Sequence, residues 1–139
     1  MAAQTVWKLS FGEIKARFDR IGDGICIQVY GGDRPHIGCA VLALPRPSLQ
    51  DCRQTSATSC VLNVSGHKDE HICRFIAEEV AKRENAVTVC TGGFHIDGMT
   101  QGQIGELMEC LPAVAKDLSD CPLKVECINS EGRLDRNGD

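Results

Sequence analysis

The sequence predicts an α+β fold, an α/β sandwich in which a mostly antiparallel sheet carries two helices on one face. Short segments with an apolar residue at every second position occur through the first 64 residues, as expected of strands. Two longer segments with apolar residues at helical spacing follow, separated by the short strand-like run 86–90. A right-handed crossover through that strand would place both helices on the same face of one sheet.

The strands come first along the chain. In 13–18, Ile14, Ala16 and Phe18 alternate with charged residues, which is the pattern of a half-buried strand. The run Gly22-Asp23-Gly24 predicts a turn between two strands, and Pro45 and Pro47 indicate a loop after the fourth. Five strands are expected before the first helix, at 5–11, 13–18, 25–30, 37–44 and 56–64.

The first helix is expected near 67–83, with Ser65-Gly66 as the cap at its start. Asp69 and Glu70 would lie in its first turn, where acidic side chains suit the helix dipole. Its apolar face would comprise Ile72, Phe75, Ile76 and Val80.

The second helix is expected to begin at Thr100, because Thr100 and Gln103 form a T-x-x-Q capping box. It should extend to about residue 111, and Pro112 should either kink it or end it. Its apolar face would comprise Ile104, Leu107, Met108 and Leu111.

Length and composition predict one domain. The chain has 139 residues, of which 42% are hydrophobic, so it can bury an ordinary core. We expect the domain to span residues 1–128, with a short strand at 123–128, and residues 129–139 to form a flexible tail.

Charge and hydropathy exclude several classes of partner. The net charge of −4 and an aromatic content of 4% argue against a nucleic-acid-binding surface. No apolar run approaches the roughly 20 residues of a membrane-spanning helix. The first residues have no basic start followed by an apolar centre, so no signal peptide is predicted and a cytoplasmic protein is expected.

Nine cysteines occur, an odd number without C-x-x-C spacing, which argues against a zinc ribbon. Most of them lie in apolar segments, including Cys39, Cys60 and Cys90, and are interpreted as small buried side chains. A redox-active cysteine remains an open alternative.

Three predicted connections contain all four histidines. His36 lies in 31–38, His67 and His71 in 65–71, and His95 in 91–97. Loops held by rigid elements commonly carry ligand-binding residues, so we expect these three to converge on one pocket. No nucleophile elbow, phosphate-binding P-loop or dinucleotide fingerprint occurs in the sequence, so a binding protein is favoured over an enzyme.

Each connection also has an alternative interpretation. Gly66 and Lys68 at a helix start suit a phosphate or carboxylate, but an ordinary solvated first turn has the same composition. His67 and His71, four residues apart on a helix, could hold a metal, although the glutamate of an H-E-x-x-H motif is missing. His95 and Asp97 could orient each other or simply belong to a turn.

Three stretches resemble the LpdD-like family of prenylated-flavin chaperones: GGDRPHIG, SGHKDEHICRFIAEEVAKREN and TGGFHIDGMTQGQIGEL, within residues 22–112. The resemblance implies a non-catalytic protein that binds prenylated FMN and delivers it to an apo UbiD-type decarboxylase, such as gallate decarboxylase. Whether plain FMN also binds is left open, and a homodimer is expected. The strand–helix half also resembles eukaryotic proteasome assembly chaperones, so an assembly or interaction module without flavin is the alternative.

The resemblance also implies the binding residues. Gly31 and Gly32 would let the backbone approach the flavin, Pro35 would stiffen the loop, and Asp33, Arg34 and His36 would bond the polar ring edge or the phosphate. The phosphate is expected on Lys68 and the backbone N–H groups of Gly66 and His67, with Arg34 as the rival. His95 and Asp97 complete the predicted set.

Overall fold

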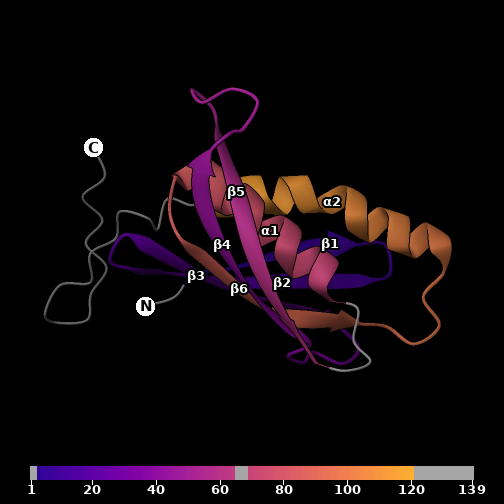
Figure 1. The fold of residues 1–139 in the computed structure, drawn as a ribbon. Coiled ribbons are helices and arrows are strands. Elements are labelled where there is room, and N and C mark those ends of the chain that lie inside the picture. Colours follow the sequence, from indigo (N-terminus) through magenta and orange to yellow (C-terminus); the bar gives the residue numbers. More distant parts are fainter. Residues whose placement is uncertain (1–2, 65–68, 121–139) are drawn as a thin grey trace, which may run out of the picture.

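A six-stranded sheet with two helices on one face makes up the described part of the chain, which is residues 3–64 and 69–120 of a computed structural model (Figure 1). The predicted α+β class is therefore confirmed. The elements are β1 (Ala3–Leu9), β2 (Gly12–Ile21), β3 (Gly24–Gly32), β4 (Cys39–Pro47), β5 (Thr55–Asn63), α1 (Glu70–Glu84), β6 (Thr88–His95) and α2 (Gln101–Ser119).

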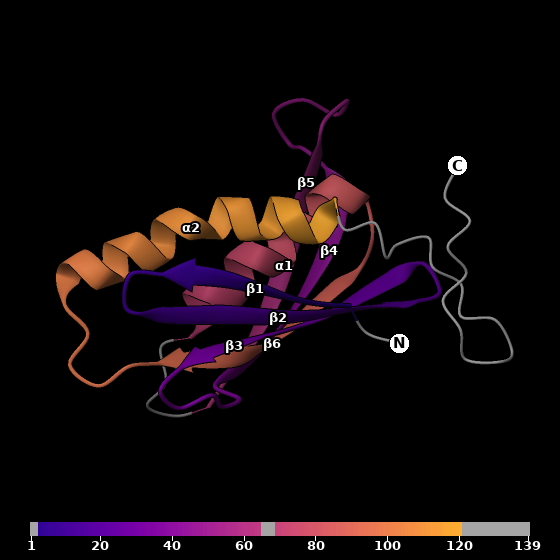
Figure 2. The same ribbon diagram turned by 180° about the vertical axis from the view of Figure 1, so that it is seen from behind.

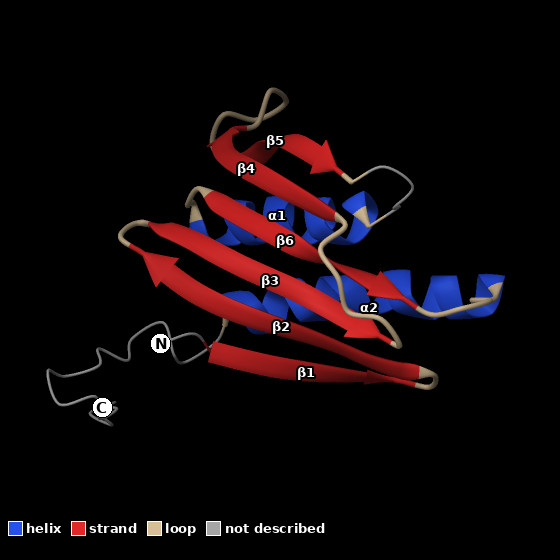
Figure 3. Ribbon diagram, turned by 90° about the horizontal axis from the view of Figure 1, so that it is seen from below, coloured by secondary structure: helices blue, strands red, loops and turns tan. Residues whose placement is uncertain are grey.

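The strand order is β1-β2-β3-β6-β4-β5, and all neighbouring pairs are antiparallel except β3 and β6, which are parallel (Figure 3). Since β6 lies between β3 and β4, the connection from β3 to β4 must pass across the end of β6. Its backbone is fixed there, because the N–H of Asp33 donates to the His95 carbonyl at 2.7 Å and that of Gly38 to the Gly92 carbonyl at 2.8 Å.

Both helices cover the same face of the sheet, as predicted (Figures 1 and 3). Helix α1 packs on β4, β5 and β6, and α2 packs on α1 and contacts β1. The alternating strand residues predicted for β2 do face this core: Ile14, Ala16 and Phe18 are at most 3% exposed. The other face of the sheet carries no element of the described chain.

Polar contacts fix the helices on the sheet. The indole N–H of Trp7 in β1 donates to Asp117 of α2 at 2.6 Å, and the Ser59 hydroxyl of β5 donates to Glu78 of α1 at 2.6 Å. Further contacts join Ser10 to Glu106 and Arg20 to Glu84.

Two strands extend into residues that were predicted as connections. Strand β4 continues through Pro45 and Pro47, where the sequence indicates a loop. Beyond Ala43, β4 is paired with β5 alone, so a proline there breaks no ladder with β6. Strand β6 includes the run 91–95, which was predicted as a connection. These residues are in the strand because they pair with residues 28–32 of β3.

Helix α1 begins later than predicted. Its N-cap is Asp69, which makes no side-chain capping bond, so the predicted cap at Ser65-Gly66 is wrong. His71 therefore lies in the first turn of α1, whereas His67 comes before the helix in the sequence. Residues 65–68 themselves lie outside the described residues.

Helix α2 begins as predicted. The Gln103 N–H donates to the Thr100 hydroxyl at 3.2 Å, and the Thr100 N–H donates to the Gln103 side chain at 2.9 Å. The helix does not end at Pro112 but continues to Ser119. Burial explains this, because Leu111, Val114, Ala115 and Leu118 are at most 1% exposed on both sides of the proline.

The cysteines are more varied than predicted. Cys39, Cys73 and Cys90 are buried, but Cys52 and Cys60 are exposed. Cys60 points away from the core because its neighbours Ser59 and Val61 in β5 occupy the inward positions opposite Ala43 and Val41.

The predicted strand at 123–128, the domain limit at 128 and the tail at 129–139 lie outside the described residues. No described helix is long and apolar enough to span a membrane.

We predict that Pro112→Ala will raise the free energy of unfolding by about 1–3 kcal/mol. Alanine restores a backbone N–H that can donate to the Met108 carbonyl, and residue 112 is exposed, so no packing is lost. Urea denaturation measures the change, with Ala113→Ser at the neighbouring exposed position as the control. A less stable Pro112→Ala protein would contradict this account and show that the core depends on the helix geometry that the proline imposes.

Candidate functional site

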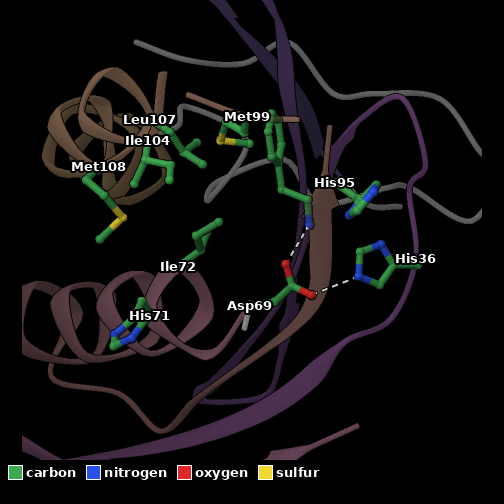
Figure 4. A pocket seen from close by; sticks show the side chains of 10 residues that line it. His36, Asp69, His71, Ile72, His95, Met99, Ile104, Leu107 and Met108 are labelled. Atoms are coloured by element: carbon green, nitrogen blue, oxygen red, sulfur yellow. Dashed lines mark hydrogen bonds and ion pairs between the residues drawn. The ribbon is translucent and has the colours of Figure 1, made fainter. Parts of the chain in front are cut away.

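A cavity of about 430 Å³ opens between the start of α1, the first half of α2 and the end of β6 (Figure 4). This volume lies within the range of small-molecule and cofactor sites. Its lining residues are His36, Asp69, His71, Ile72, Phe94, His95, Met99, Ile104, Leu107 and Met108.

One side of the cavity is apolar. Ile104, Leu107 and Met108 come from α2, Ile72 comes from α1, and Met99 precedes α2. The first half of α2 extends beyond the start of α1, so its apolar residues have no complete cover (Figures 1 and 2). Ile104 and Met108 are each 39% exposed as a result.

The other side is polar and is organised around Asp69, which is only 5% exposed. One carboxylate oxygen accepts the backbone N–H of Phe94 at 2.9 Å, and the other lies 2.8 Å from His36 Nε2 (Figure 4). Gly38 leaves the space for this carboxylate, because a Cβ atom at residue 38 would collide with Asp69 Oδ2. Asp69 thus connects the β3–β4 connection, the end of β6 and the start of α1.

The imidazole of His36 is held at both ring nitrogens. Nδ1 lies 2.8 Å from the carbonyl of Arg34, and the ring lies against Gly93, where an added Cβ would be 2.6 Å from Nε2. The hydrogen bond to the Arg34 carbonyl raises the pKa of His36 above its usual value, burial partly opposes this, and the contact with Asp69 adds to the increase.

A second histidine–carboxylate pair lies beside the first. His95 Nε2 is 2.8 Å from Asp97, and Asp97 also forms a 3.3 Å ion pair with Arg34. The bond from His95 and the charge of Arg34 lower the pKa of Asp97. The ring centroids of His36 and His95 are 6.4 Å apart, so two imidazoles flank the polar end of the cavity.

The remaining residues predicted in 31–38 do not line the cavity, and Gly31 and Gly32 belong to β3. The space left by Gly31 and Gly32 is filled by protein, since a Cβ there would meet the carbonyls of Glu13 and His95 respectively. Asp33 is exposed and anchored through its backbone on β6. Gly66, His67 and Lys68 lie outside the described residues.

A smaller groove of about 250 Å³ lies on the helix-free face of the sheet. Its lining includes Pro35 and His36, together with Gln28, Tyr30, Ile37, Thr91 and Gly92. His36 lines this groove and the main cavity, so the β3–β4 connection forms a wall of both.

Sequence reasoning missed two features of the site. Asp69 was interpreted only as a first-turn acid, and nothing local distinguishes it from Glu70, because its partners are 33 and 25 residues away along the chain. The apolar face of α2 was recognised, but periodicity cannot separate residues that line a cavity from residues that pack in a core. Residues 3–64 and 69–120 contain no group of three His, Cys, Asp or Glu side chains placed to hold a metal.

The buried cysteines beneath the site are poor nucleophiles. Burial raises the pKa of Cys39, and a hydrogen bond with Cys90 together with burial raises the pKa of Cys73. These thiols therefore stay protonated and pack as apolar side chains.

Comparisons with solved structures identify the fold. Seven chains of solved structures match, among them one from the crystal structure of a chaperone complex for yeast 20S proteasome assembly. The match covers 86% of this chain and 97% of that chain with a TM-score of 0.51 at 12% identity, so it shows a shared fold alone. No curated protein matches the sequence.

A family model defines the class more closely. The prenylated flavin chaperone LpdD-like domain matches residues 10–121, which include every described lining residue of the cavity. The chain therefore belongs to the LpdD-like prenylated flavin chaperone family, and the resemblance stated from the sequence is confirmed.

We predict that Gly38→Ala will destabilise the protein by about 1–3 kcal/mol, because the new methyl group must displace the Asp69 carboxylate. Gly105→Ala is the matched control: its Cβ meets nothing within 4 Å, so the free energy of unfolding should rise by about 0.5–1 kcal/mol. Thermal and urea denaturation of both variants provide the measurement. Equal stability of Gly38→Ala and the wild type would mean that the Asp69 contacts contribute nothing.

Proposed function

We propose that the protein binds prenylated FMN in the cavity, without catalysis, and delivers it to an apo UbiD-type decarboxylase in the cytoplasm. The observation that carries the proposal is the two-sided cavity, which is apolar on α2 and lined opposite by His36, Asp69 and His95, within the segment that matches a flavin chaperone family. Plain FMN is the second ligand to test.

The two sides suit the two parts of such a ligand. A flat ring system enlarged by a prenyl-derived part needs apolar contacts, which Ile72, Ile104 and Met108 provide. The heteroatoms at the ring edge need hydrogen-bonding partners, and His95 can provide one. Both ring nitrogens of His36 already contact Arg34 and Asp69, so His36 contributes a polar wall and its charge. The other predicted residues would act mainly by holding the β3–β4 connection and these imidazoles in place; they are Gly31, Gly32, Asp33, Pro35 and Asp97.

Membership of a chaperone family supports a carrier role. In this role the half-exposed Ile104 and Met108 leave one side of the ligand accessible for transfer. Activation of a purified apo-decarboxylase by the flavin-loaded protein tests delivery, and sedimentation velocity tests the expected homodimer. The shared fold with a proteasome assembly chaperone does not by itself favour the alternative of an assembly module.

We predict that Ile104→Asn will weaken flavin binding roughly tenfold, because about 1–2 kcal/mol of apolar contact is lost from the cavity wall. Fluorescence quenching of the titrated flavin measures the dissociation constant. Val87→Asn is the control and should bind flavin as the wild type does. Val87 is 44% exposed and directly precedes β6, at the end of the strand that is far from the cavity. Equal affinities of Ile104→Asn and the control would contradict the proposal that the flavin ring binds in this cavity.

The phosphate is expected on Lys68 and the backbone N–H groups of Gly66 and His67. We predict that Lys68→Ala will weaken flavin binding roughly tenfold to a hundredfold, because a charge-assisted hydrogen bond is worth about 1.5–3 kcal/mol. Arg34→Ala should have a smaller effect, since Asp97 already pairs with that guanidinium. Flavin titrations of the two variants, with circular dichroism as the folding control, decide between them, and unchanged affinity in both would sink the flavin-phosphate assignment.

A further inference from the structure

Asp69 is buried against three segments that are far apart in the sequence. It occupies the N-cap position of α1, accepts a hydrogen bond from the Phe94 N–H of β6, and contacts His36 of the β3–β4 connection. Its side chain makes no capping bond to α1, although capping is the usual role of an aspartate at this position. The carboxylate is thus directed away from its own helix and toward the cavity.

The partners of His36 determine its protonation. A backbone carbonyl can only accept a hydrogen bond, so the 2.8 Å contact with Arg34 requires a proton on Nδ1. An ionised carboxylate also only accepts, so the 2.8 Å contact with Asp69 requires a proton on Nε2. A histidine with both nitrogens protonated is an imidazolium.

The charges around His36 agree with this state. From α1 it faces the Asp69 carboxylate, and from β6 it faces the His95 ring at 6.4 Å. From its own connection, the charge of Arg34 is paired with Asp97. His71 lies on α1 at another part of the cavity lining (Figure 4).

We propose that Asp69 is the positioning residue of the cavity, which holds His36 as an imidazolium across the polar end and so fixes the wall that faces the ligand. The consequence for flavin binding rests on the proposed function, whereas the protonation of His36 does not. When His36 loses a proton, the contact with the Arg34 carbonyl or the contact with Asp69 must break, and the imidazole is then held less firmly in the cavity wall.

The direction of the pH effect follows from the raised pKa of His36. The pair stabilises the fold fully below the pKa of an unfolded histidine, and this contribution is lost as the pH rises through the higher pKa of the folded state. Flavin affinity should decline over the same interval, by about tenfold if one charge-assisted hydrogen bond is lost.

Asp69→Asn separates charge from shape. The asparagine oxygen can still accept the Phe94 N–H, but its amide group now donates toward His36 Nε2. His36 should then be neutral with its proton on Nδ1, so its titration midpoint should move to lower pH. ¹⁵N NMR of the imidazole nitrogens follows this directly, and flavin dissociation constants between about pH 5 and about pH 9 follow the effect on binding.

Asp97→Asn is the matched control, since it removes the carboxylate of the neighbouring histidine pair, which does not contact His36, and should shift the His36 midpoint less than Asp69→Asn does. An unchanged midpoint in Asp69→Asn would overturn the proposal. If Asp69→Asn does not fold, the wild-type spectrum decides, because a single protonated nitrogen on His36 at neutral pH overturns the proposal and two support it. Failure of the wild type to bind flavin at any pH would defeat the proposed function and leave the NMR result standing.

Discussion

The parallel pairing of β6 with β3 is the constraint on which the site depends. Because β6 occupies the place beside β3, the chain between β3 and β4 must cross the end of β6 instead of forming a hairpin. That crossing brings His36 beside His95, although they are 59 positions apart in the sequence. Backbone hydrogen bonds join the connection to β6 at both of its ends. The concentration of polar residues in this connection follows from its position, since it forms a wall of two cavities and no part of the core.

A buried carboxylate is costly unless its charge is compensated, so Asp69 requires an explanation. The Phe94 N–H would otherwise lose a partner where β6 ends, and His36 supplies the opposite charge. The same contacts close the polar end of the cavity, so the stability of the fold and the shape of the site share one set of bonds. Gly38 is part of this set, because only a residue without a side chain leaves room for the carboxylate.

Most of the fold was predictable from local pattern, and the site only in part. The alternating residues of β2 and the Thr100–Gln103 capping box predicted that strand and the start of α2 correctly. Both signals are local, because one-sided burial and capping involve residues close together in the sequence. Pro45 and Pro112 led to wrong predictions, because tertiary contacts override what proline favours locally. Strand β4 is not paired with β6 at Pro45, and burial in the core keeps α2 helical through Pro112. The partnership of Asp69 with His36 and Phe94 depends on strand order, which no local pattern encodes.

The apolar side of the cavity has features that suit the proposed carrier role. Helix α2 extends past the start of α1 (Figure 2), and the apolar residues Ile104 and Met108 in its first half are each 39% exposed. Exposed apolar surface of this kind lowers the stability of the empty protein. A ligand that covers this surface gains the free energy of its burial. A wall that stays half open gives modest affinity and an accessible ligand, whereas a closed one would favour retention. If the protein passes its ligand on as proposed, it gains from the incomplete cover that α2 provides, and the histidines opposite would set the orientation in which the ligand is presented.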